Sequence, residues 1–420
     1  MGGLFGVASE GDCVTDLFYG TDYHSHLGTR RGGLAVMDGA RIRRHIHDIT
    51  NAQFRSKFED DIKKLRGHRG IGVISDYEDQ PLIIGSHLGV YAIVTVGVIR
   101  NADRLITQAF HKKAHLSEMS GGEVNPTELV ANLINQEATF EDGIERALEA
   151  IEGSCSLLLL TDHGIYAGRD RLGRTPVVVG RKTGSRAVTF ETCAFPNLGY
   201  EIERYLGPGE VVLVTENGIE QKKAPGERLQ VCGFLWVYYG YPASSYEGIN
   251  VEATRYRCGA ALARRDSVKV DFVAGIPDSG VAHAIGYANA AGVPYARPYV
   301  KYTPTWPRSF MPPDQQVRDL VARMKLIPVP DLIAGKRVLF AEDSIVRGTQ
   351  LQDTIRRLYD CDAHVDQYAD QRSEKYRAMV ENIRARLQLT TLQYQQLDDL
   401  VTAIGLPKHR LCTYCWDGAE

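Results

Sequence analysis

Two adjacent carboxylates, followed by hydroxyl groups, an arginine and a glycine, give one stretch of this sequence a clear chemical use. The stretch is VLFAEDSIVRGTQ (338–350), in which Glu342 and Asp343 end an apolar run. A loop that leads into a helix presents backbone N–H groups to a phosphate, and Gly348 lets that backbone approach closely. Carboxylates repel phosphate but suit ribose hydroxyls, or a Mg²⁺ ion that a pyrophosphate shares. The pattern favours a sugar phosphate over the alternative, a solvated acidic turn.

Two strands of the buried type must position this stretch. VDFVAGI (270–276) precedes the small-residue helix GVAHAIGYANAAG (280–292), and KRVLFAEDS (336–344) precedes the helix LQDTIRRLYD (351–360). Strand, loop and helix repeated in this way are typical of a parallel, doubly wound sheet, so the C-terminal half is expected to be α/β.

The N-terminal half is β-rich. Short apolar runs separated by Gly, Asp and Asn turns lie at 71–77, 91–99, 155–162 and 210–218. Apolar residues recur at helical spacing at 127–136 and 140–151. This pattern predicts an α+β domain of stacked antiparallel sheets. The cluster KKAPGERLQ (222–230) is typical of a linker. We therefore expect domains over 1–228 and 229–370, and a helical C-terminal cap with a CxxC pair over 371–420.

The stretch at 338–350 resembles the motif that binds phosphoribosyl pyrophosphate (PRPP) in type I phosphoribosyltransferases. More specifically, it resembles the motif of the glutamine phosphoribosylpyrophosphate amidotransferase (amidophosphoribosyltransferase) family. Other segments follow in that family's order: GIPDSG (275–280) resembles its pyrophosphate loop, VKYTPTWPRSFMPPDQQVR (300–318) its catalytic loop, and CGFLWVYYGYPASSYEGINV (232–251) its domain junction. The resemblance covers residues 2–417. It implies a domain like the N-terminal-nucleophile hydrolases, followed by a type I phosphoribosyltransferase domain.

The resemblance implies a full set of PRPP-binding residues, namely Asp278, Ser279, Gly280, Glu342, Asp343, Ser344, Val346, Arg347, Gly348 and Thr349. Three of them, Ser279, Glu342 and Asp343, would surround Mg²⁺, and Glu342 stands where the family usually has an aspartate. Lys301 and Arg308 would be catalytic, because pyrophosphate departs more easily when Lys, Arg and Mg²⁺ hold its charge. Ordinary solvated charge is the alternative for these two, since Thr303 stands where an Arg is usual and the loop is one residue longer.

The glutaminase half departs from the family at four positions. Gly2 replaces the nucleophilic Cys, Ser75 the Arg that holds the glutamine carboxylate, VGV (96–98) the N-G-N of the oxyanion hole, and Pro126 the Asp that binds the amine. The surrounding frame still matches at RDRLGRTP (169–176) and PGE (208–210). We predict a retained fold without glutamine hydrolysis. The internal Cys13 lacks the amine that serves as base, and we expect it to pack.

Cys232, Cys412 and Cys415 match three of four positions at which some family members hold a [4Fe-4S] cluster. Cys361 is the one candidate for the fourth position, because the segment that follows the predicted helix at 351–360 is shorter here than in the family. Thiolates at CxxC spacing favour iron–sulfur or zinc, and three reduced, packed cysteines are the alternative. The shortening also removes an edge strand, which invites either pairing with another chain or disorder. We expect a homo-oligomer.

Composition narrows the class of protein. The 420 residues are 44% apolar and 24% charged, which is a globular composition, and the net charge of -3 gives no reason to propose nucleic acid or a membrane surface as partner. No apolar run approaches a membrane span, and a cytoplasmic location is the expectation.

These observations predict a Mg²⁺-dependent phosphoribosyltransferase of the purine-synthesis type. It would transfer phosphoribosyl from PRPP to ammonia or another amine and release pyrophosphate. The alternative is a catalytically inactive regulator that binds PRPP.

Overall fold

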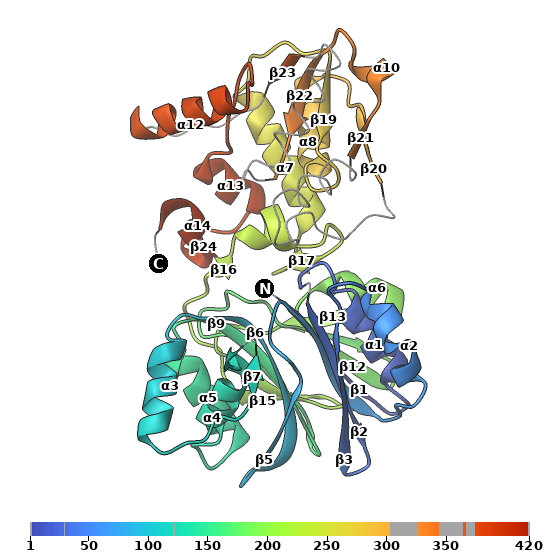
Figure 1. Ribbon diagram of the computed structural model, residues 1–420, viewed down its shortest axis with the longest axis vertical. Helices are drawn as coiled ribbons and strands as arrows, with labels where there is room; N and C mark the ends of the chain where they lie inside the picture. The colour runs from blue at the N-terminus through green and yellow to red at the C-terminus, as the bar shows by residue number, and fades with distance from the viewer. Residues whose placement is uncertain are drawn as a thin grey trace.

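The computed structural model describes residues 2–28, 30–120, 122–302, 326–343, 364–366 and 374–418. Within these residues, two stacked antiparallel sheets form the N-terminal half and a parallel sheet forms the core of the C-terminal half, which lies above the sandwich in Figure 1. The predicted fold class, α+β followed by α/β, is confirmed.

The first sheet has the strand order β13-β11-β12-β1-β4-β2-β3 among the described residues. Its strands are β1 (Gly3–Ser9), β2 (Arg31–Asp38), β3 (Arg41–Asp48), β4 (Arg69–Ser75), β11 (Val178–Lys182), β12 (Ser185–Thr189) and β13 (Glu201–Tyr205). The second sheet has the order β15-β14-β10-β9-β6-β5. Its strands are β5 (Leu82–Ser86), β6 (Gly89–Ile99), β9 (Gly153–Thr161), β10 (Gly164–Gly168), β14 (Val211–Val214) and β15 (Ile219–Lys223). A short hairpin adds β7 (Met119–Ser120) and β8 (Glu123–Val124).

Alternation along each strand explains why the two sheets stack. Leu158 and Leu160 on β9 face the first sheet, whereas Leu157 and Leu159 face the helices on the outside. Successive side chains point to opposite faces of a strand, so a continuous apolar run is buried on both sides. The run CSLLLLTD therefore lies between two apolar layers.

Helices cover the outer face of each sheet (Figure 1). They are α1 (Val14–Asp22), α2 (Phe54–Ile62) and α6 (Phe195–Leu198) on the first sheet, and α3 (Ala102–His111), α4 (Pro126–Ile134) and α5 (Phe140–Ala150) on the second. Two of these helices begin at a residue whose side chain caps the first turn. The Asn125 side chain accepts a hydrogen bond from the Thr127 N–H at 2.8 Å before α4, and Thr139 accepts one from the Asp142 N–H at 3.2 Å before α5.

The C-terminal half is built on the parallel strands β19 (Phe272–Gly275), β22 (Arg337–Ala341) and β23 (His364–Asp366). Helices α7 (Val251–Arg264) and α8 (Val281–Ala291) cover one face and α12 (Glu374–Arg386) covers the other. The remaining described strands and α-helices are β16 (Val231–Cys232), β17 (Ser245–Tyr246), β18 (Ile249–Asn250), β20 (Tyr299–Lys301), β21 (Leu326–Pro328), α10 (Pro330–Ile333), α13 (Leu397–Ile404), β24 (Leu411–Cys412) and α14 (Tyr414–Asp417). The described residues also form three short helical turns, η1 (Thr192–Ala194), η2 (Leu235–Tyr239) and η3 (Lys408–Arg410).

The two halves share apolar core at the junction. Trp236 and Tyr246 from the junction, and Leu400 and Ile404 from α13, belong to the same buried cluster as the residues between the two sheets. Helix α13 ends at Gly405, whose φ of 90° is the left-handed conformation of a helix C-cap. The predicted domain limits remain predictions. The predicted helix at 351–360 lies outside the described residues.

The described residues include no helix that combines the length and the apolar character needed to cross a bilayer.

Candidate functional site

The candidate PRPP site lies where β19 and β22 end. The two strands are adjacent and parallel, with Gly275 opposite Ala341, so the loops that follow them leave the same edge of the sheet. The Ile276 N–H donates to the Ala341 carbonyl at 3.0 Å, which holds the loops together. A Cβ at Gly280 would lie 2.1 Å from that carbonyl oxygen, so this close approach requires glycine. Open α/β sheets bind ligands at this kind of edge.

A hydrogen bond joins the two loops. The Ser279 hydroxyl donates to Glu342 Oε1 at 3.0 Å, and the Asp343 N–H donates to the same oxygen at 3.1 Å. Burial of the carboxyl group, and then the negative charge of Asp343, raises the pKa of Glu342 well above its ordinary value. The structure therefore brings three of the sequence-predicted residues together, with Glu342 favouring its protonated form in the absence of a cation.

Lys301, predicted to be catalytic, ends strand β20 beside the first loop. Its Nζ lies 2.6 Å from Asp278 Oδ2, in an ion pair whose side chains are 35% and 68% exposed. Exposed pairs of this kind contribute little to stability, so the pair can open at small cost when an anion approaches. The lysine thus lies within reach of the loop that the sequence assigns to pyrophosphate.

Several predicted residues lie outside the described part of the chain. They are Arg308, Ser344, Val346, Arg347, Gly348 and Thr349.

Two buried residues of the site were missed by sequence reasoning. Arg255 on α7 is 4% exposed and donates from Nε to the Trp236 carbonyl at 2.9 Å and from Nη2 to the Gly240 carbonyl at 3.0 Å. Burial lowers the pKa of Arg255, and the charge of Asp343 opposes that shift, so the guanidinium lies within electrostatic reach of the acid pair. Arg255 repeats at helical spacing with Val251 and Cys258, and an arginine on such an apolar stripe is the signal that could have revealed it.

His283, the second missed residue, lies in the first turn of α8, directly after the loop. It is 4% exposed, and its Nε2 has no hydrogen-bond partner among the described residues. Burial, and then the positive charge of Arg255, lowers the pKa of His283 to about 3, so the imidazole is neutral. It therefore adds no second positive charge beside Arg255.

The positions that correspond to the family's glutaminase groups are packed against, or hydrogen-bonded to, neighbouring backbone. Gly2 is buried, and a Cβ there would lie 2.2 Å from the Ile74 carbonyl oxygen. Ser75, at the arginine position, is 4% exposed and donates its hydroxyl to the Glu78 carbonyl at 2.6 Å. The segment 96–98 belongs to β6 and pairs with β9, with Gly97 opposite Cys155. A paired strand offers no loop of converging N–H groups for an oxyanion.

Cys13 is packed, as predicted. It is 1% exposed, and burial followed by the charge of Asp12 raises the pKa of its thiol to about 12. A thiol rather than a thiolate stands there at neutral pH, and a thiol is a poor nucleophile.

The predicted iron–sulfur ligands are neighbours. Cys232 pairs with Cys412 across the parallel strands β16 and β24, and Cys415 lies in α14 just beyond. Burial raises the pKa of Cys232 to about 12, so its thiol is protonated. In the part of the chain that the structure describes, no three His, Cys, Asp or Glu side chains are arranged to hold a metal ion, and Cys361 lies outside it. The assignment of an iron–sulfur cluster to Cys232, Cys412 and Cys415 remains a prediction.

Comparisons with known proteins agree with this geometry. Residues 68–195 match the glutamine amidotransferase domain family. The amidophosphoribosyltransferase of Bacillus subtilis is 28% identical over 434 residues, covering 96% of this chain and 89% of that protein. The amidophosphoribosyltransferase of Archaeoglobus fulgidus is 30% identical over 347 residues, covering 80% of this chain and 75% of that protein.

A solved structure extends the likeness to the whole fold. Glutamine PRPP amidotransferase from B. subtilis, in complex with ADP and GMP, superposes with a TM-score of 0.88 at 27% identity and covers 99% of this chain and 96% of its own. The likeness therefore includes both halves and the junction between them. With the paired loops at the ends of β19 and β22, these matches show that the chain belongs to the amidophosphoribosyltransferase family.

Proposed function

We propose that this protein transfers the phosphoribosyl group of PRPP to ammonia or another amine, with Mg²⁺ and with release of pyrophosphate. The observation that carries the proposal is the hydrogen bond of 3.0 Å between Ser279 and Glu342, which joins two loops at the shared edge of β19 and β22. It brings a hydroxyl and an acid pair to the place where α/β sheets bind phosphorylated ligands. Family membership supports the same chemistry.

The donor set fits Mg²⁺. Ser279, Glu342 and Asp343 offer hard oxygen ligands, and Mg²⁺ characteristically takes one or two carboxylates together with the phosphates of its substrate. The bound ion would neutralise part of the charge on the departing pyrophosphate. The protein's own residues would supply Glu342 as a carboxylate, its proton passing to solvent, and Lys301 would leave Asp278 so that its ammonium can approach the same charge.

The direct test is a calorimetric titration of PRPP with and without Mg²⁺, followed by an assay of pyrophosphate release with ammonium, with other amines and with glutamine. We expect affinity for PRPP that depends on Mg²⁺, and pyrophosphate release with ammonium or another amine. Absence of any Mg²⁺-dependent affinity would overturn the proposal.

The regulator that binds PRPP without turnover remains the second candidate. The two candidates differ in the role of Lys301: turnover requires this residue, whereas binding of PRPP alone does not. We expect Lys301→Ala to lower pyrophosphate release far more than affinity for PRPP. If the wild-type chain bound PRPP but released no pyrophosphate with any nucleophile, and Lys301→Ala left affinity intact, the regulator would be the better description.

We also propose that the N-terminal half does not hydrolyse glutamine. Gly2 has no nucleophilic side chain, Ser75 has no guanidinium, and residues 96–98 are engaged in a paired strand. The proposal is tested by measuring glutamate after incubation with glutamine and PRPP, and glutamate formed at the rate of pyrophosphate release would contradict it.

A further inference from the structure

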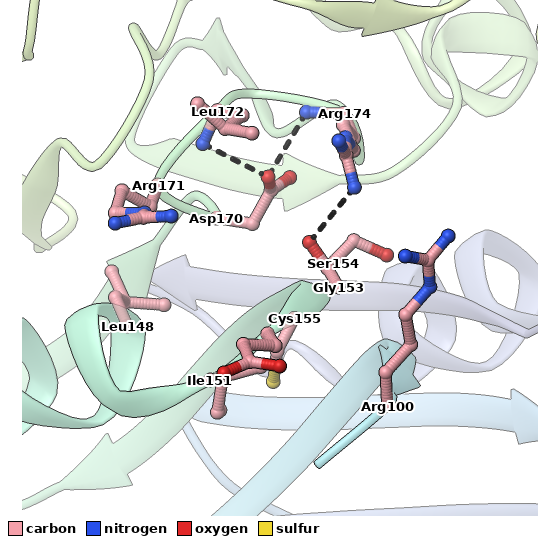
Figure 2. A pocket seen from close by; sticks show the side chains of 11 residues that line it. Arg100, Leu148, Ile151, Gly153, Ser154, Cys155, Asp170, Arg171, Leu172 and Arg174 are labelled. Carbon is pink, nitrogen blue, oxygen red and sulfur yellow. Dashed lines mark hydrogen bonds between the residues drawn. The ribbon is translucent and has the colours of Figure 1, made fainter. Parts of the chain in front are cut away.

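A cavity lined by three arginines lies in the N-terminal half, not in the half that carries the candidate PRPP site. Its volume is about 140 Å³, and it lies between the end of α5, the start of β9 and the turn 170–174, as Figure 2 shows. Arg100, Arg171 and Arg174 line it, together with the acids Glu152 and Asp170. We propose that this cavity binds an inorganic oxyanion of the size of phosphate or sulfate.

The two acids that line the cavity are already engaged. Asp170 is 2% exposed, and its carboxylate accepts the backbone N–H groups of Leu172 at 3.2 Å, Arg174 at 3.1 Å and Thr175 at 2.6 Å. Glu152 forms an ion pair with Arg104 at 2.9 Å. Their charges are therefore largely compensated by groups other than the arginines that line the cavity.

Two of these arginines, Arg171 and Arg174, keep donors for a ligand. Arg174 makes one long hydrogen bond, from Nη1 to the Gly153 carbonyl at 3.5 Å, and its buried Nε has no partner among the described residues. Arg171 forms no ion pair with any residue that the structure describes. A buried guanidinium N–H without a partner is unfavourable, and an oxyanion satisfies it with a charge-assisted hydrogen bond.

The cavity's size limits the ligand. Pockets for drug-sized molecules begin at roughly 300 Å³, so 140 Å³ suits a single tetrahedral oxyanion rather than a whole nucleotide. Guanidinium groups favour phosphate and sulfate because their N–H groups match the spacing of the oxygens. A nucleotide would have to enter by its terminal phosphate with the nucleoside outside.

The cavity also adjoins the C-terminal segment. The Arg100 guanidinium lies 4.6 Å from the ring centre of Tyr414, which stands between Cys412 and Cys415. The backbone of the same turn binds the junction, since the Gln230 N–H donates to the Leu172 carbonyl at 2.7 Å. An anion held here would contact residues of the N-terminal half that anchor both the junction and the last helix.

The test is a calorimetric titration of the full chain with sodium sulfate and sodium phosphate at constant ionic strength, with chloride as reference. Arg171→Gln and Arg174→Gln remove one guanidinium each. Arg181→Gln is the matched control, an exposed arginine of β11 elsewhere in the same half. We expect saturable binding to the wild-type chain, at least about tenfold weaker in each of the first two variants and unchanged in the control.

Two further experiments test where the anion binds and whether a nucleotide can supply it. Ser279→Ala alters the PRPP site in the other half, so the part of the sulfate response that depends on Arg171 and Arg174 should stay unchanged in it. ATP that binds with the same dependence on Arg171 and Arg174 would support the site and identify a nucleotide phosphate as its ligand. The proposal is overturned if sulfate behaves like chloride, or if Arg171→Gln and Arg174→Gln, folded with unchanged melting temperatures, bind as the wild type does.

Discussion

At the scale of single residues, Glu342 decides how the candidate PRPP site responds to its ligands. Its oxygen accepts from both Ser279 and the Asp343 N–H, and its pKa is raised by burial and by the neighbouring carboxylate. The raised pKa favours the protonated form, and a cation bound beside the group would favour the carboxylate. Without a metal ion, two carboxyl groups lie side by side, which disfavours ionising both of them. A bound metal ion would remove this repulsion, so the site favours metal binding.

The first prediction concerns pH. Because the pKa of Glu342 is raised in the folded chain, the folded state holds this proton more tightly than the unfolded state does. Its contribution to the stability of the Mg²⁺-free protein is therefore present at acid pH and lost as pH rises from the ordinary glutamate pKa towards the raised one. Mg²⁺ needs the carboxylate, so affinity for PRPP with Mg²⁺ should rise over the same window, measured by calorimetry at a series of pH values.

Variants at position 342 provide the control for that prediction. Glu342→Gln should lower the Mg²⁺-dependent affinity for PRPP by at least about tenfold and remove its rise with pH. Glu342→Asp keeps the charge and should retain both. An unchanged pH profile in Glu342→Gln would show that another group titrates.

The second prediction concerns Gly2. Gly2→Cys should not restore glutamine hydrolysis, because its Cβ would lie 2.2 Å from the Ile74 carbonyl and Ser75 offers no guanidinium. The forced shift should destabilise the fold by about 1–3 kcal/mol. Gly11→Cys, where a Cβ meets nothing within 4 Å, is the control for stability. Glutamate release by Gly2→Cys above the wild-type level would refute the prediction.

At the scale of elements, α13 joins parts of the fold that are far apart in the sequence. Ile404 is 1% exposed and packs in the cluster that contains Trp236 and the residues between the two N-terminal sheets. Arg257 on α7 donates from Nε to the Ala403 carbonyl at 2.5 Å, which adds a polar contact to the same helix. Helix α13 therefore stabilises the junction and is more than a cover for the C-terminal sheet.

The third prediction follows from that packing. Ile404→Ala should lower the free energy of unfolding by about 2–5 kcal/mol, because it leaves a cavity in a closed apolar cluster. Thr402→Ala, an exposed position on the same helix, should change it by no more than about 0.5 kcal/mol. Urea unfolding followed by circular dichroism and tryptophan fluorescence measures both. Equal effects of the two variants would mean that α13 does not share the core.

At the scale of the whole molecule, one buried ion pair connects the two halves. Arg169, in the frame RDRLGRTP of the N-terminal half, is 0% exposed and lies 2.7 Å from the carboxylate of Glu247, between β17 and β18. Arg169 also donates to the Gly173 carbonyl at 2.6 Å. Removing one partner of such a pair leaves a buried charge without its counterion.

The fourth prediction is that Glu247→Gln lowers the free energy of unfolding by about 3 kcal/mol. The loss should appear mainly at the junction, so we expect a single thermal transition in the wild type and a broader or divided transition in Glu247→Gln. Asp60→Asn, which removes the exposed pair between Asp60 and Lys63, should produce no measurable change. A Glu247→Gln chain that unfolds like the wild type would show that the pair does not join the halves.

The sequence by itself determined the class of each half and the edge at which the site forms. Short apolar runs separated by Gly, Asp and Asn turns predicted the stacked sheets, since such runs are typical of strands. The buried strands that end at residues 276 and 344 predicted the parallel sheet, and their shared edge made Ser279, Glu342 and Asp343 neighbours. These are local patterns, and local patterns are visible in one sequence.

Only the tertiary structure decided which distant groups meet. Arg255 lies within electrostatic reach of Asp343, and His283 within reach of Arg255, because α7 and α8 pack on one face of the sheet; helical spacing can mark Arg255 as buried but does not encode these contacts. The arginine cavity likewise joins a strand end, a helix end and a turn that are separated by up to about 70 residues. Raised and lowered pKa values follow from burial, and burial is a property of the packed molecule.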